Sequence, residues 1–247
     1  MIPRRVSLAL VLLALPALAA AQSKSDAFAG KIPPVSGQLF RVSDRVELTL
    51  GAAISLNDAF FTKYFGSVKA TYHLGEFWTL GAYGAGGAAD PTNSAVLCSS
   101  SVGCGNAQQK QLWQVPGSIT AIVGLEAGWT PVYGKLNVLA EQVAHFDLSI
   151  LAGPDLVLHD EVLSFADAER LATAGGSPGQ KMAFGGHVGV GARLFLSEWG
   201  AIRLEVKDLF YPVEVPNNAA LGTDWQNQLF TEIGFSFFFP TRNRPVR

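Results

Sequence analysis

The feature that most constrains this chain is a period-two alternation of apolar and polar residues along most of its length. In segment 45–56, Val46 and Leu48 lie on one side of an extended chain, whereas Glu47 and Thr49 lie on the other. The same alternation recurs in 64–74, 77–88, 119–129, 136–150, 184–196, 202–207 and 229–239. About eight such segments, with no helical period between them, predict an all-β fold.

Composition indicates where this fold resides. Hydrophobic residues make up 49% of the chain and charged residues only 15%, whereas water-soluble domains carry about 25% charge. Beyond the first residues, no stretch is long and apolar enough for a transmembrane helix. A transmembrane antiparallel up-and-down β-barrel of about eight strands over 45–239 accounts for both facts, because its apolar residues are spread over short strands that face lipid.

The two ends of the chain indicate export. Residues 1–21 resemble a secretory signal, in which Arg4 and Arg5 precede an apolar run and a small-residue cleavage pattern. We expect 22–44 to be a periplasmic leader and 240–247 to be a periplasmic tail. The predicted location is the bacterial outer membrane.

The connections between strands alternate in length. Short turns are expected at 75–76, 131–134 and 197–200, and longer loops at 89–116, 153–182 and 212–226. Short periplasmic turns and long extracellular loops are typical of outer-membrane barrels. Good helix formers in 160–173 predict a short helix in the second long loop.

Aromatic residues lie beside the expected short turns, which predicts an aromatic girdle at the periplasmic membrane surface. Its predicted members are Trp78, Trp129, Tyr133, Trp199 and Phe239. A soluble barrel with its apolar face inward has the same period. The girdle, the low charge and the loop asymmetry favour the membrane arrangement.

The polar face of the strands is then predicted to line the barrel interior. The ionisable residues on this face are Glu47, Lys69, His73, Glu126, Glu141, His145, Asp147, Arg193, Arg203, Glu205, Lys207 and Glu232. Side chains fill the interior of an eight-stranded barrel, so we expect a buried charge network and no wide channel. A gated ion or proton path is the alternative.

Both cysteines lie in one Gly/Ser-rich stretch. Because an exported chain reaches an oxidising compartment, a local Cys98–Cys104 disulfide is predicted in an extracellular loop. The pair has no neighbouring His or Cys at metal-ligand spacing.

His145, Asp147 and Ser149 invite comparison with a hydrolase triad. At i and i+2 along one strand, however, neighbouring side chains stand about 7 Å apart, too far for a hydrogen-bonded relay. We therefore expect no enzymatic activity. The sequence also shows no phosphate-binding loop before a helix and no metal-ligand spacing, so no cofactor is expected. The net charge of −2 and the absence of a basic cluster argue against a nucleic-acid partner.

Several segments in a shared order resemble a myxobacterial outer-membrane β-barrel domain family. They are 40–49, 55–58, 63–65, 143–148, 189–196 and 203–208. The resemblance implies an outer-membrane barrel, and some members of that family belong to the gliding motility machinery as structural components. It implies no catalytic residue.

These observations favour a structural or scaffold component of a cell-envelope complex, and the resemblance implies a place in gliding motility. Its expected partners are outer-membrane lipid and other envelope proteins. The alternative is a narrow pore or small-solute channel.

Overall fold

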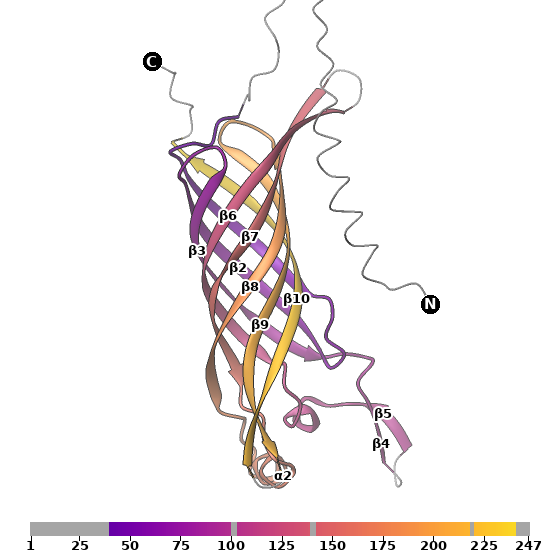
Figure 1. Ribbon diagram of the computed structural model, residues 1–247. Coiled ribbons are helices and arrows are strands. Elements are labelled where there is room, and N and C mark those ends of the chain that lie inside the picture. Colours follow the sequence, from indigo (N-terminus) through magenta and orange to yellow (C-terminus); the bar gives the residue numbers. More distant parts are fainter. Residues whose placement is uncertain (1–39, 100–102, 139–141, 218–219, 241–247) are drawn as a thin grey trace, which may run out of the picture. The chain divides into compact units, whose positions relative to one another are not determined.

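The computed structural model describes residues 40–99, 103–138, 142–217 and 220–240. The signal 1–21, most of the leader 22–44 and the tail beyond Pro240 lie outside these ranges. Eight strands form a closed barrel in the order β1-β10-β9-β8-β7-β6-β3-β2, and Figure 1 shows the barrel from the side. The barrel strands are β1 (Val46–Ser55), β2 (Phe61–His73), β3 (Trp78–Pro91), β6 (Ile119–Val138), β7 (Gln142–Asp160), β8 (Gln180–Phe195), β9 (Gly200–Asn217) and β10 (Ala220–Phe239).

All neighbouring strands are antiparallel, and the first strand closes the ring with the last. Val46 pairs with Phe239 at one end of this seam, and Ser55 pairs with Phe230 at the other. The predicted eight-stranded up-and-down barrel is therefore confirmed. Both ends of the barrel segment lie at the same rim, which we call the periplasmic rim.

The expected turn at Pro131–Gly134 is wrong. Strand β6 continues through it to Val138, and its pairing with β7 shifts register between Trp129 and Val132. Proline has no N–H for the ladder, and a bulge absorbs this missing donor without ending the strand. The actual connection, 139–141, lies outside the described residues.

The opposite, extracellular rim carries the small elements. A β4 (Val96–Ser99) and β5 (Gly103–Asn106) hairpin and a 3-10 turn, η2 (Gln109–Leu112), follow β3. The helix predicted within 160–173 is confirmed as α2 (Phe165–Thr173), where the Ser164 hydroxyl accepts a hydrogen bond from the Asp167 N–H. Among the described residues, no helix is both long and apolar enough to cross a membrane.

The expected long loop at 212–226 is also wrong. Strands β9 and β10 pair from Gly200↔Phe237 up to Asn217↔Ala220, so this region is an extended hairpin. The alternation of apolar and polar residues did not predict this hairpin. The outward residues become polar here, so the pattern that marks the rest of the strands ends. The loops expected at 89–116 and 153–182 shorten to 92–118 and 161–179.

Candidate functional site in the barrel lumen

The barrel is inverted relative to a water-soluble one, with an apolar outside and a charged inside. The outward side chains of Leu50, Val190 and Leu204 are 50%, 57% and 47% exposed, whereas Glu47 and His73 are fully buried. The buried ionisable groups also include Lys63, Lys69, Glu126, His145, Asp147, Asp155, His159, His187, Arg193, Arg203, Glu205, Lys207 and Glu232. An apolar band of this extent needs hydrocarbon around it, because exposing so much apolar surface to water is unfavourable.

Lysines and glutamates occupy the centre of the lumen. The Lys69 ammonium lies 2.9 Å from Glu126 and 2.7 Å from Glu205. The Lys207 ammonium lies 3.0 Å from Glu205 and 3.0 Å from Glu232. Each buried charge thus has opposite charges in direct contact, which offsets the large cost of removing it from water.

Two arginines continue the network toward the periplasmic rim. Arg203 donates to Glu47 at 3.1 Å and also contacts Glu205. Arg193 donates to Asp147 at 2.8 Å and also contacts Glu47. The ring of His73 lies 2.9 Å from the Glu47 carboxylate. Glu47 therefore joins three side chains contributed by three different strands.

A histidine and a tyrosine extend the network toward the extracellular rim. His187 Nδ1 lies 2.8 Å from Asp155, and the Tyr83 hydroxyl donates to the same carboxylate at 2.8 Å. Asp155 was not predicted to be a lumen residue, because it lies in the segment 153–182, which was expected to be a loop. Its alternation with outward Leu156 was the signal that could have found it.

Apolar clusters occupy the lumen on both sides of the charges. The extracellular cluster comprises Phe65, Tyr83, Ile119, Ile122, Val157, Val162, Ala183, Leu209, Tyr211, Val213 and Phe230. The periplasmic cluster comprises Val42, Phe195, Ala201 and Phe238, with Phe40 and Tyr133 against it. Arg45 stabilises the periplasmic end of the barrel, because its guanidinium donates to the carbonyls of Glu198 at 2.6 Å and Pro240 at 3.0 Å. The charged network is thus packed within the barrel, and its ion-paired side chains are at most 8% exposed.

Three predicted site residues differ from the expectation. Tyr133 is not part of the lipid-facing girdle: its hydroxyl pairs with His145 Nδ1 at 2.8 Å and its ring packs on Phe195. The bulge after Trp129 changes the side on which the following residues point, which explains the inversion. His145 is inside the barrel, but it lies among these aromatic rings rather than in the ion-paired centre. Glu141 lies outside the described residues.

The other aromatic residues of the predicted girdle lie outward at the periplasmic rim. Trp78 and Trp129 are register partners with ring centroids 6.3 Å apart. Trp199 stacks on Phe237 with centroids 6.1 Å apart, and Phe239 is half exposed. At the other rim, the disulfide joins Cys98 of β4 to Cys104 of β5.

The residues that suggested a hydrolase triad have separate partners. His145 bonds Tyr133, Asp147 holds Arg193, and the Ser149 hydroxyl donates to the Gly191 carbonyl at 3.4 Å. Within the described ranges, His, Cys, Asp and Glu form no group of three or more that could hold a metal ion.

No family model and no curated protein matches this chain. Among solved structures, the N-terminal β-barrel domain of OprF from Pseudomonas aeruginosa is similar at 10% identity, covering 80% of this chain and 98% of that one, with a TM-score of 0.46. Ail, the attachment invasion locus protein of Yersinia pestis, aligns at 11% identity over 80% of this chain and 99% of that one, with a TM-score of 0.40. The outer membrane protein OprG from Pseudomonas aeruginosa aligns at 12% identity over 81% and 97%, with a TM-score of 0.40.

Three features together define the molecule. They are the closed ring, the apolar outer wall, and the difference in length between the connections at the two rims. Eight antiparallel strands with a lipid-facing band and an aromatic girdle are the architecture of outer-membrane barrels. The protein is an eight-stranded β-barrel of the bacterial outer membrane whose lumen holds paired charges between two apolar clusters.

Proposed function

We propose that this protein is a non-conducting structural barrel that displays extracellular loops and offers its periplasmic rim to envelope proteins. The observation that carries this proposal is the packed lumen, where paired charges lie between two apolar clusters. An eight-stranded barrel whose interior is filled by side chains has no room for a hydrated ion. Its binding surfaces must then be its rims and its outer wall.

A narrow pore is the alternative that the charged lumen raises. An ion crossing it would have to separate contacts such as Lys69–Glu205 and Arg193–Asp147. Breaking a buried pair costs about 3–5 kcal/mol because an uncompensated charge remains. The pairing therefore supports the scaffold role over the pore.

Exposed apolar residues on the extracellular elements support a role in binding proteins. Phe165 at the start of α2 is 71% exposed, and Val96 and Leu97 of the β4–β5 hairpin are 51% and 45% exposed. A place in the gliding motility machinery is part of the proposal, and its support is the resemblance of the sequence segments described above. The proposal includes no catalytic step.

The scaffold role is tested by electrical recording on the folded protein in planar lipid bilayers. Folding is checked first by the different gel mobility of heated and unheated samples. We expect no steady single-channel conductance from the wild type. Steady conductance whose size changes in Arg203→Gln would refute the scaffold proposal and favour the pore.

The partner and motility roles are tested in cells. Replacing 161–179 with a Gly/Ser linker removes α2 but leaves the barrel strands unchanged. We expect normal insertion into the membrane, with loss of gliding and of chemical cross-links to envelope proteins. Normal gliding and unchanged cross-links would remove this loop from the proposal.

The absence of enzymatic activity is tested separately with Ser149→Ala. A changed lipid profile of cells that carry this variant would contradict it.

A further inference from the structure

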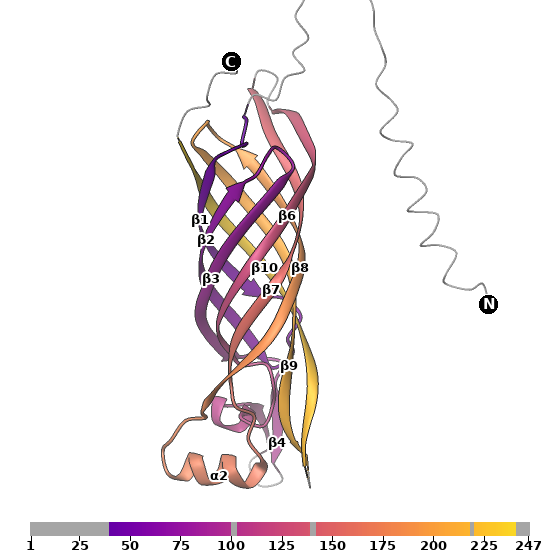
Figure 2. The same cartoon turned by 60° about the vertical axis from the view of Figure 1, so that its left-hand side comes forward.

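The barrel wall is not paired to its full height. Strands β8 and β9 pair from Phe195↔Ala201 up to Gly186↔Phe210. Above this point β8 stays paired with β7 as far as Gln180, and β9 stays paired with β10 as far as Asn217. The two strands therefore diverge toward the extracellular rim, as Figure 2 shows.

Prolines on β9 explain why the ladder stops here. Cβ atoms built at Gly185 and Gly189 would collide with the carbonyl oxygens of Phe210 and Val206, so the even-numbered carbonyls of β9 point toward β8. The next even positions above Phe210 include Pro212 and Pro216. Because proline has no N–H, this edge of β9 lacks the donors that would pair with β8. The missing donors also disfavour pairing with a strand from another chain.

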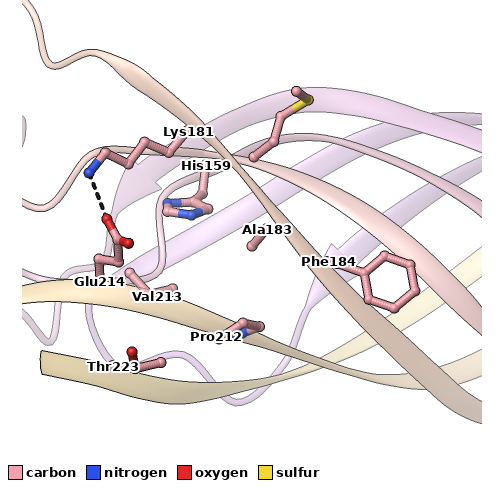
Figure 3. Close-up of a pocket in the computed structure, with 9 residues that line it drawn as sticks. His159, Lys181, Ala183, Phe184, Pro212, Val213, Glu214 and Thr223 are labelled. Carbon is pink, nitrogen blue, oxygen red and sulfur yellow. Dashed lines mark hydrogen bonds and ion pairs between the residues drawn. The ribbon is translucent and has the colours of Figure 1, made fainter.

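A cavity of about 420 Å³ lies at this opening, within the range of small-molecule sites. Figure 3 shows it between β8 and β9. Ala183 and Val213, which belong to the extracellular apolar cluster, line its inner part. Met182 and Phe184 line its outer part and are 73% and 68% exposed. The cavity thus connects the apolar interior of the barrel mouth with the outer wall.

The opening lies at the level where the outer wall changes from apolar to polar. Outward residues of β7 change from Leu156 and Leu158 to Asp160. Phe184 pairs with Leu156, whereas Lys181 pairs with His159 next to Asp160. The outer part of the cavity is therefore continuous with the lipid-facing band, and Lys181 lies just above it.

The polar end of the cavity is held by one cation and two carboxylates. The Lys181 ammonium lies 2.9 Å from Glu214 of β9 and 3.1 Å from Glu161 (Figure 3 shows the Glu214 contact). This bridge spans the opening between the two strands.

We propose that this opening binds one acyl chain of an outer-leaflet lipid, which enters sideways between β8 and β9. The end of the chain lies against Ala183 and Val213, and the rest of the chain lies along the lipid-facing band outside Met182 and Phe184. Continuity with the lipid-facing band selects a lipid as the occupant, and the prolines of β9 disfavour an added peptide strand. The site would give the scaffold a specific lipid contact beyond the general solvation of its outer wall.

The test uses the folded full-length protein in vesicles of phosphatidylethanolamine and a phosphatidylcholine that carries a diazirine at one acyl-chain end. After irradiation, labelled residues are identified by mass spectrometry. We expect label on inward Ala183 and Val213, in addition to outward Leu204. Leu151, buried deep in the lumen, gives the background.

A cavity-filling variant, Ala183→Phe, is expected to reduce the label on Val213 to the Leu151 background. Ala192→Phe on the outer wall is the matched control and should leave it unchanged. The proposal would be overturned if, in the wild type, Val213 were labelled no more strongly than Leu151. This wild-type measurement tests the proposal even if Ala183→Phe does not fold. The same absence of label, with protection against hydrogen exchange at those amides of 180–185 that do not pair with β7, would indicate a strand from a second copy instead. Neither outcome bears on conductance, so the scaffold proposal is tested separately.

Discussion

Removing the charge of Glu47 should destabilise the barrel more than removing any exposed charge. This carboxylate is fully buried and contacts Arg193, Arg203 at 3.1 Å and His73 at 2.9 Å. The variant Glu47→Gln keeps the side-chain volume but leaves the two arginines with less opposing charge.

The expected loss of stability depends on the ion pairs that Arg193 and Arg203 keep in Glu47→Gln. Breaking a buried pair costs about 3–5 kcal/mol. Arg193 keeps Asp147 at 2.8 Å and Arg203 keeps its contact with Glu205, so the lower end applies. A loss of about 3 kcal/mol lowers the folded-to-unfolded ratio by roughly a hundredfold.

The assay is urea unfolding in lipid vesicles, followed by tryptophan fluorescence. With a slope of about 1–3 kcal/mol per molar urea, the midpoint should fall by about 1–3 M. Asp90→Asn, at an exposed position on β3, is the control and should change stability by less than about 0.5 kcal/mol. Equal midpoints for Glu47→Gln and Asp90→Asn would refute the view that the ionic lumen stabilises the fold.

Three further predictions test other parts of the structure. Gly124→Ala should cost about 1–3 kcal/mol, because its Cβ would collide with the Asp155 carboxylate and lie 2.7 Å from the Tyr83 ring, whereas Gly86→Ala, with its nearest atom at 3.8 Å, should be tolerated in the same assay. Leu204→Lys should cost up to about 2–4 kcal/mol by placing a charge in lipid, and an unchanged urea midpoint would contradict the membrane orientation. Cys98→Ser should speed protease cleavage within the β4–β5 hairpin but leave the heat-dependent gel mobility of the barrel unchanged, because the bridge closes only a local loop.

The sequence by itself determined which side of each strand meets lipid. A strand turns successive side chains to opposite faces, so alternation alone separates Val46 from Glu47 and places Lys69 and Glu205 together on the inner face. The low charge and the aromatic positions then selected lipid over water for the apolar side. These features are local, and no knowledge of the ring was needed to find them.

Only the tertiary structure decided which strands end where and which charges meet. The Pro131 segment is a bulge within a strand because β7 continues alongside it, and the 212–226 region is a hairpin because β9 and β10 keep pairing as far as Asn217 and Ala220. Lys69 meets Glu205 across the lumen, although they are 136 positions apart in the sequence. Alternation determines the face of the sheet on which a side chain lies. The partners of that side chain depend on register and ring closure, which are determined by hydrogen bonds between segments distant in the sequence.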